Sequence, residues 1–155
     1  MASSPEERLK ALGITLPEWL APVSGYVGIL RTGNLLIVSG QLCYGPEAKL
    51  AAVGRLGAEV TIEQGRFAAR CCAINVLGRV RSEIGSLDRV TCVLRLGGFL
   101  LTTWDFTDHA AVMIGATGGM TDVFGDAGSH ARCTIGVASA PLGSTVQVDA
   151  MVEIA

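Results

Sequence analysis

The chain has 155 residues, a length that fits one domain, with a formal net charge of −2 and a pI near 5.6. Lysine occurs only at Lys10 and Lys49 and there is no basic run, which disfavours binding of nucleic acid through its phosphates. The longest apolar run, residues 93–101, is broken by Arg95 and falls short of the ~20 residues that a membrane helix needs, so no membrane partner is expected.

The composition predicts an oligomer. Hydrophobic residues make up 50% of the chain and charged residues 17%, and the mean hydropathy is +0.47. Ordinary domains carry roughly 25% charged residues, so a lone chain of this size would leave apolar surface in water. A compact monomer with a core rich in glycine and alanine is the alternative, because such a core also raises the mean hydropathy.

Five cysteines occur without the spacing of a zinc site, and both histidines stand alone in the sequence. We therefore expect reduced thiols and no metal. The first residues lack the charged and apolar regions of a secretory signal, so a cytoplasmic protein is expected.

In chain order, Ser4 and Glu7 form a capping-box pattern that predicts a short helix ending before Gly13. Residues 16–22 form a connector bounded by prolines, with Trp19 as a packing residue. A strand is expected over 26–31, a turn over 32–34, and a second strand over 35–38 that is wholly apolar and so buried on both faces. Ser39-Gly40-Gln41 then either admits a ligand to the backbone amides or forms a bulge.

A second capping box at Thr61 and Gln64 opens the clearest helix, which should run to Ile84 and stop at Gly85. Asn75 in this helix is expected to bond a neighbouring loop. The predicted core stripe is Phe67, Cys71, Ile74, Leu77 and Ile84.

A third long strand is predicted from Val90, with Cys92, Leu94 and Leu96 facing the core and Arg95 on the other face. Residues 99–105 are expected to form a loop. Residues 106–113 and 120–124 read as two helical pieces separated by the glycine-rich run 115–119. No Gly-Lys-Ser/Thr follows that run, so it is not a phosphate loop, and no cofactor is expected.

Two strands are predicted at the end of the chain, beginning with Arg132 and with Val146. In the last one, apolar residues alternate with Gln147, Asp149 and Glu153. An arginine and a carboxylate turned to one face would make an anion-binding site, although a half-solvated hairpin shows the same pattern. Periodicity alone favours the solvated hairpin.

The predicted order β-β-α-β-α-β-β indicates an α+β fold with one mixed sheet and two helices on one face. The other face of the sheet would be free to pack on neighbouring subunits.

With these elements in order, the chain resembles the RidA/YjgF family of reactive-intermediate deaminases, also called the L-PSP endoribonuclease family. The resemblance covers residues 23–155, read as a single domain, with residues 1–22 as an N-terminal helix and connector. The matching segments are Ser24-Gly25-Tyr26, Gly33-Asn34-Leu35-Leu36, Ser39-Gly40-Gln41, the helix with Asn75, Leu87-Asp88-Arg89-Val90, Ala131-Arg132-Cys133 and Pro141. The element Phe124-Gly125-x-x-Gly128-x-His130-Ala131-Arg132 is similar to that of a divergent subgroup labelled endoribonuclease or chorismate-mutase-like.

The resemblance implies a chorismate-mutase-like fold and a homotrimer with three clefts between subunits. In the deaminating members an arginine, here Arg132, binds the carboxylate of the substrate, and a tyrosine, here Tyr26, lines the pocket. An acidic residue that activates water in those members is replaced here by Gln147. Asp149, two residues further on the same strand face, could take over this role or bind substrate, but a position facing solvent or a neighbouring subunit is favoured. Backbone amides near Ser39, Gly40 and Cys133 would orient the substrate, and Thr117 would help shape the cleft.

The activity implied is hydrolysis of small imine or enamine acids to 2-oxo acids and ammonia, that of a deaminase. Because an amide cannot take a proton from water at neutral pH, a trimer that binds small carboxylates without turnover is the alternative. His130 is the nearby candidate for a general base, but a structural role in the loop is favoured. Ribonuclease action is disfavoured by the charge balance.

Overall fold

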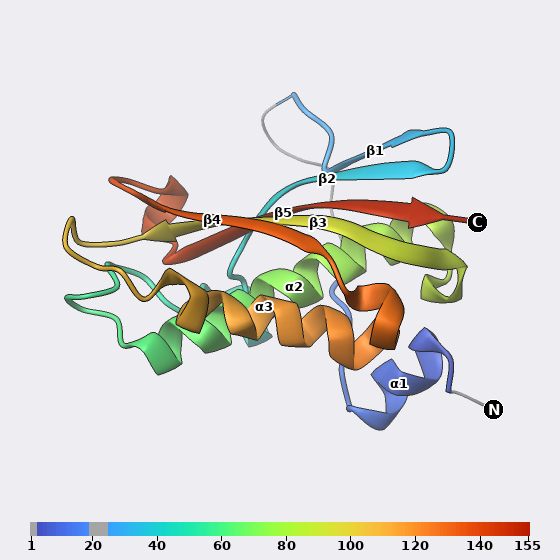
Figure 1. Ribbon diagram of the computed structural model, residues 1–155, viewed down its shortest axis with the longest axis horizontal. Coiled ribbons are helices and arrows are strands. Elements are labelled where there is room, and N and C mark those ends of the chain that lie inside the picture. Colours follow the sequence, from blue (N-terminus) through green and yellow to red (C-terminus); the bar gives the residue numbers. More distant parts are fainter. Residues whose placement is uncertain (1–2, 19–24) are drawn as a thin grey trace.

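A computed structural model describes residues 3–18 and 25–155, which form three α-helices and a five-stranded sheet (Figure 1). Trp19 lies outside the described residues. The elements are α1 (Pro5–Ala11), β1 (Ile29–Thr32), β2 (Leu35–Leu42), α2 (Ile62–Ile84), β3 (Val90–Leu101), α3 (His109–Phe124), β4 (Ala131–Val137) and β5 (Val146–Ile154). Short 3₁₀ turns lie at Pro46–Ala48 (η1), Leu87–Arg89 (η2), Gly125–Gly128 (η3) and Pro141–Gly143 (η4).

The sheet is mixed, with strand order β1-β2-β5-β3-β4, and α2 and α3 cover one of its faces (Figure 1). The predicted α+β fold is therefore confirmed. The two C-terminal strands do not form a hairpin, because β3 lies between them. β4 runs parallel to β3, and α3 forms the crossover that a parallel pair requires.

β5 lies in the middle of the sheet and shows the predicted alternation. Its apolar residues Val146, Val148, Ala150, Val152 and Ile154 are buried, and the residues between them are half-buried. A period of two on a central strand separates a core face under the helices from an outer face.

α2 begins at the predicted capping box and ends at Gly85. The predicted core stripe is partly wrong, because Phe67 is 54% exposed whereas Cys71, Leu77 and Ile84 are buried. Both α3 and the sheet pack against α2, so its buried surface is wide and built largely from small side chains. These are Ala68, Ala69, Cys72, Ala73 and Val76.

α3 is one continuous helix, not the two pieces that the glycine run predicted. A methyl group on Gly115 would collide with the backbone carbonyl of Arg66 on α2, and one on Gly119 would lie 2.8 Å from the Cβ of Ala73. The glycines therefore let α3 approach α2 closely, and this packing offsets their low helix propensity.

The first three strands differ from their predicted bounds. β1 begins at Ile29, three residues after Tyr26, and β2 continues to Leu42. Ile37 is 42% exposed, so β2 is buried on one face only.

β3 continues to Leu101 through the predicted loop. Register shifts between Val90 and Cys92 and between Val93 and Arg95 break its alternation, so Val93 is buried whereas Leu94 is exposed.

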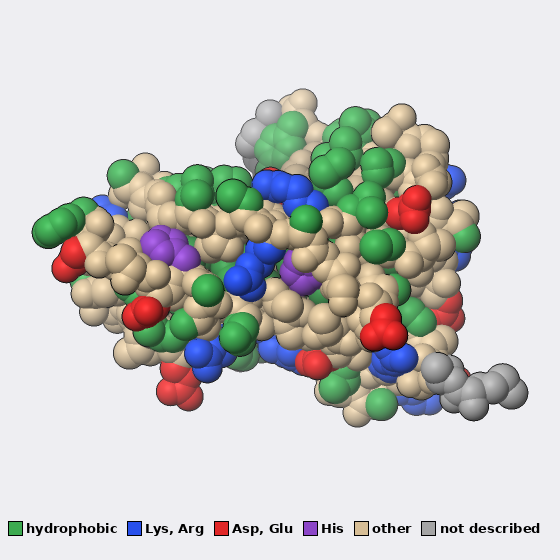
Figure 2. All heavy atoms as spheres, viewed as in Figure 1, with side chains coloured by type: hydrophobic (Ala, Val, Ile, Leu, Met, Phe, Trp, Pro, Cys, Tyr) green, Lys and Arg blue, Asp and Glu red, His purple; other side chains and the backbone are tan. Residues whose placement is uncertain are grey.

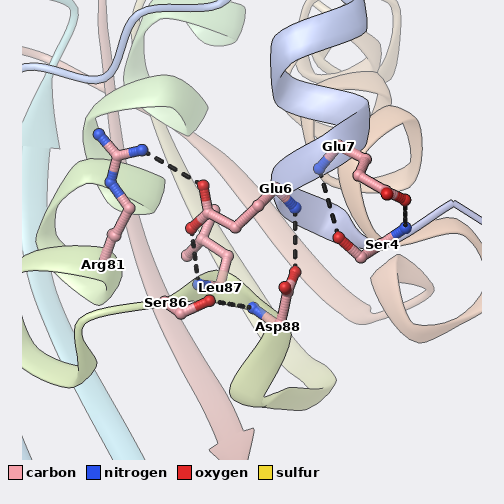
Figure 3. A network of polar contacts seen from close by, with 7 residues as sticks. All are labelled: Ser4, Glu6, Glu7, Arg81, Ser86, Leu87 and Asp88. Carbon is pink, nitrogen blue, oxygen red and sulfur yellow. Dashed lines mark hydrogen bonds and ion pairs between the residues drawn. The ribbon is translucent and has the colours of Figure 1, made fainter.

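α1 is fixed to the rest of the molecule by a polar network (Figure 3). The capping box is complete, with Ser4 Oγ accepting from Glu7 N and Glu7 Oε2 accepting from Ser4 N. The carboxylate of Glu6 accepts from Leu87 N at 2.9 Å and from Arg81 at 3.4 Å. These contacts join α1 to the end of α2 and to η2.

The outer face of the sheet, opposite the helices, carries exposed apolar side chains, among them Leu30, Ile37 and Ile135. No helix within residues 3–18 and 25–155 is long and apolar enough to cross a membrane.

Candidate functional site

Arg132 lies on the edge strand β4 and reaches toward α3. Its Nη1 donates to Thr117 Oγ1 at 3.0 Å, and the arginine is exposed. Thr117 is half-buried in the middle of α3, so the hydroxyl holds one side of the guanidinium against the helix. In Figure 2, histidine side chains reach the surface of this side of the molecule, with Lys or Arg side chains between them.

His130 joins the same group. The turn η3 ends at Gly128, and His130 lies between it and the first residue of β4, Ala131. The ring contacts the carbonyl oxygen of Gly128 through Nδ1 at 2.7 Å and Thr117 Oγ1 through Nε2 at 3.2 Å. The structure therefore brings Thr117, His130 and Arg132 together, and we call these three residues the arginine cluster.

Gln147 lies on β5 at another place in the sheet. Its side chain covers Gly40 of β2, occupying the space that a Cβ at position 40 would fill. The hydroxyl of Ser39 donates to the carbonyl of Val27 at 2.7 Å and so holds the chain next to Tyr26 against β2. We call Tyr26, Ser39, Gly40 and Gln147 the glutamine cluster.

Asp149 is already paired. Its Oδ1 lies 3.0 Å from Nη1 of Arg95 and covers Gly97, where a side chain would collide with it. The carboxylate of Asp149 is therefore paired with the guanidinium of Arg95 of the same chain, on the outer face of the sheet.

Arg132 and Gln147 lie on opposite faces of the sheet, because Gln147 pairs with Phe99, which pairs with the outer-face residue Ile135. Paired residues on neighbouring strands share a face, and Arg132 pairs with Leu96, which pairs with Ala150 on the helix side. Cys133 pairs with Gly97 and so with Asp149 on the outer face. The hypothesis that the arginine and the carboxylate turn to one face is thus wrong within a single chain. Arg132 is level with Ala150, the residue next to Asp149, and neighbouring residues of a strand point to opposite faces.

A cavity of about 980 Å³ adjoins the glutamine cluster on the helix side of β2. It is lined by Tyr26, Gly40, Gln41 and Arg79, among others. Nε of Arg79 donates to Gln41 Oε1 at 3.4 Å, and burial lowers the pKa of this guanidinium from its ordinary value.

Sequence reasoning named Gln41 only as part of the Ser39-Gly40-Gln41 segment that could admit a ligand, and it passed over Arg79 as polar lining of this cavity. Cys71, Asn75 and Arg79 recur at intervals of four residues on α2, which is the signal that could have placed them on one side of the helix.

The thiols differ in their surroundings. Cys43, Cys71 and Cys72 are buried, Cys133 is exposed, and none of the five forms a disulfide. Burial, with a smaller contribution from nearby Cys43, raises the pKa of Cys71 to about 11. Among residues 3–18 and 25–155, no group of three or more His, Cys, Asp or Glu side chains could hold a metal ion.

A mixed sheet covered on one face by two helices, with a guanidinium on its parallel edge strand, defines an α+β protein of the chorismate-mutase-like class. The family model described as "YjgF/chorismate_mutase-like, putative endoribonuclease" matches residues 6–154. The chain belongs to this YjgF/RidA family.

Individual relatives agree with this membership. Protein TCP17 of Trypanosoma cruzi is 42% identical over 149 residues, which cover 94% of this chain and 91% of that protein. The crystal structure of Atu1372 from Agrobacterium tumefaciens, a protein of unknown function, has a TM-score of 0.89 at 38% identity and covers 97% of this chain and 94% of its own. A Shewanella oneidensis structure named as a putative endoribonuclease has a TM-score of 0.93 at 32% identity, covering 98% and 100%.

Proposed function

We propose that the protein hydrolyses small imine or enamine acids to 2-oxo acids and ammonia, in clefts between the subunits of a homotrimer. One observation carries the proposal. The guanidinium of Arg132 is exposed, is held by a side-chain hydroxyl, and has no carboxylate within 4.0 Å among the described residues.

This arrangement suits capture of a carboxylate. A planar guanidinium has five N–H donors and can bind a carboxylate through two parallel hydrogen bonds. Thr117 uses one donor of Arg132 and fixes the orientation of the group, which leaves the other donors for a ligand. Orienting the fork in advance reduces the entropy lost on binding.

The separation of the two clusters supports the proposed homotrimer. Strands lie ~4.8 Å apart, and β3 and the thickness of the sheet separate Gln147 from Arg132 within one chain. A second copy packed on the exposed apolar residues of the outer face would bring its own glutamine cluster to the arginine cluster of its neighbour. The low charge content and the exposed Leu30, Ile37 and Ile135 support such packing.

The chemistry needs little beyond positioning. Water adds to the imine carbon, its two protons pass in turn to the nitrogen, and the carbon–nitrogen bond breaks to leave a 2-oxo acid and ammonia. The amide of Gln147 can hold the attacking water, and the carboxylate bound at Arg132 fixes the carbon in front of it. The free thiols fit a reducing, cytoplasmic setting.

The second candidate function is binding of small carboxylates without turnover. Gln147 favours it, because the neutral amide stands where an acid would activate water.

The test is ammonia release from freshly generated 2-iminopropionate. Wild-type protein should accelerate it, and Arg132→Ala should reduce the acceleration by at least ~100-fold with the oligomer intact, because a bidentate, charged contact to the substrate is lost. Arg31→Ala is the matched control. Arg31 is an exposed arginine on β1 that donates to the carbonyl of Gly33 and lies outside both clusters. Binding of pyruvate without any acceleration would instead establish the second function, and unchanged activity of Arg132→Ala would contradict both.

A further inference from the structure

A hydroxyl, an imidazole and a guanidinium form one hydrogen-bonded row where β4 meets α3. Thr117 Oγ1 stands in the middle, 3.0 Å from Arg132 Nη1 and 3.2 Å from His130 Nε2. The far nitrogen of His130, Nδ1, lies 2.7 Å from the carbonyl oxygen of Gly128. The row thus runs from a backbone carbonyl to the proposed carboxylate-binding group.

The partners at both ends fix the direction of each hydrogen bond. A carbonyl oxygen only accepts, so Nδ1 of His130 carries the proton and donates to Gly128. The neutral ring then has a lone pair on Nε2, and Thr117 donates its hydroxyl proton to it. Arg132 only donates, so Thr117 Oγ1 accepts from it.

This assignment leaves one position open on the hydroxyl. A hydroxyl has one proton and two acceptor lone pairs. The proton of Thr117 goes to His130 and one lone pair accepts from Arg132, so the second lone pair can accept from a water beside the arginine. A nucleophile or proton donor hydrogen-bonded to a base that a third group orients is the arrangement that activates hydroxyls in enzymes.

We propose that Thr117 and His130 form a proton relay that supplies the base function absent at Gln147. This inference rests on the proposed function. As water adds to the imine carbon, its proton passes to Thr117 Oγ1 while the hydroxyl proton of Thr117 passes to Nε2 of His130. The imidazolium returns this proton through Thr117 to the nitrogen, which gives a carbinolamine. The hydroxyl proton of the carbinolamine then passes to the nitrogen by the same relay as the carbon–nitrogen bond breaks, so one water is consumed, one ammonia leaves, and the relay returns to its starting state.

Thr117 is the catalytic residue in this account, and His130 is a positioning residue that acts through it. Gln147 of a neighbouring copy keeps the separate task of holding the water. This division of tasks, with proton transfer by Thr117 and His130 and water binding by Gln147, explains how a chain with an amide at position 147 can still move protons.

Several charged groups lie on the elements around His130. Arg132 is the one in the row itself. The others are Asp126 on η3, Asp122 on α3 with its partner Arg70 on α2, Arg8 of α1 beside Val123 and Gly125, and Arg95 paired with Asp149 on the opposite face of the sheet.

The test compares His130→Gln with His109→Gln, since the chain has these two histidines only. Glutamine can still accept from Thr117 but cannot take a proton. We expect His130→Gln to lower kcat for 2-iminopropionate on the order of 100-fold with KM little changed.

His109→Gln should keep the wild-type rate, because His109 packs edge-on against Phe106 and lies outside the row. Thr117→Val should lose activity and Thr117→Ser should recover it, which separates the hydroxyl from the shape of the side chain.

Each outcome decides between the relay and the proposed function. If Arg132→Ala abolishes activity while His130→Gln keeps the wild-type kcat, the relay is wrong and the function stands. If wild-type protein does not accelerate ammonia release, both are wrong. Nitrogen NMR of the resting protein at pH 8 gives a readout without turnover: a proton on Nδ1 of His130 supports the relay, and one on Nε2 overturns it.

Discussion

At the scale of single residues, Cys71 and Asn75 show how the helix side of the sheet treats polar groups. Asn75 donates through Nδ2 to the carbonyls of Leu42 and Tyr44, both at 2.9 Å, which confirms the predicted bond to a neighbouring loop. Cys71 lies one turn earlier on α2, and its Sγ lies 3.4 Å from the position that a Cβ on Gly45 would occupy. The amide is satisfied by the backbone that leaves β2, whereas the thiol is kept neutral by burial.

The raised pKa of Cys71 predicts a loss of stability at alkaline pH. An unfolded thiol ionises around pH 9, whereas the pKa of Cys71 in the folded chain is about 11, so the folded state holds the extra proton between these values. Its stabilising contribution is complete below pH 9 and is lost as the pH rises toward 11.

Urea denaturation at pH 8 and pH 10.5 checks this. The free energy of unfolding of Cys71→Ala should fall by about 2 kcal/mol less than that of wild type between the two pH values. Cys133→Ala is the control, because that thiol is exposed. Equal losses in wild type and Cys71→Ala would contradict the assignment.

At the scale of elements, the helices were easier to predict at their ends than in their packing. Capping boxes at Ser4 and Thr61 placed two helix starts, because caps are local and depend on three or four neighbouring residues. The continuity of α3 could not be read from its glycines, since it depends on contact with Arg66 and Ala73 of another helix. Helix propensity alone predicts a break at residues 115–119, whereas packing against α2 keeps α3 helical there.

The strands likewise combine local features that could be predicted with long-range features that could not. The alternation of β5 was readable because β5 is regular and central. The register shifts in β3 and the insertion of β3 between β4 and β5 were not, since both depend on long-range pairing.

The close approach of α3 to α2 predicts opposite effects for two nearby glycines. Gly115→Ala should lower the free energy of unfolding by about 2 kcal/mol, because the new methyl group meets the rigid backbone carbonyl of Arg66. Gly118→Ala should raise it slightly, by up to ~1 kcal/mol, because the nearest atom lies 4.0 Å away and alanine is the better helix former. Chemical denaturation of both variants measures this, and equal effects would show that the glycines are not needed for packing.

At the scale of the whole molecule, the candidate site divides between two faces and two places of one sheet. The residues of the candidate site are proposed from the family resemblance, because motifs such as Ser39-Gly40-Gln41 and Ala131-Arg132-Cys133 are short and ordered along the chain. Their separation was not, because whether Arg132 and Gln147 share a face depends on the pairing of β3 with both β4 and β5. The contact of Thr117 with His130 and Arg132 likewise depends on where the uninterrupted α3 lies.

The proposed site, completed between copies, has a consequence that a site within one chain lacks. Under this proposal Arg132→Ala would remove one half of each cleft and Gln147→Ala the other half, so each variant alone should be nearly inactive. In a trimer assembled from both variants, some clefts combine the intact Gln147 of one subunit with the intact Arg132 of its neighbour.

The measurement that tests the central claim most directly is therefore ammonia release from 2-iminopropionate by mixed oligomers of Arg132→Ala and Gln147→Ala. Random assembly from equal amounts should restore about one quarter of the wild-type activity, since each half of a cleft is intact in about half of the cases. Activity no greater than the sum of the two separate variants, in oligomers shown by mass spectrometry to contain both, would contradict a shared site.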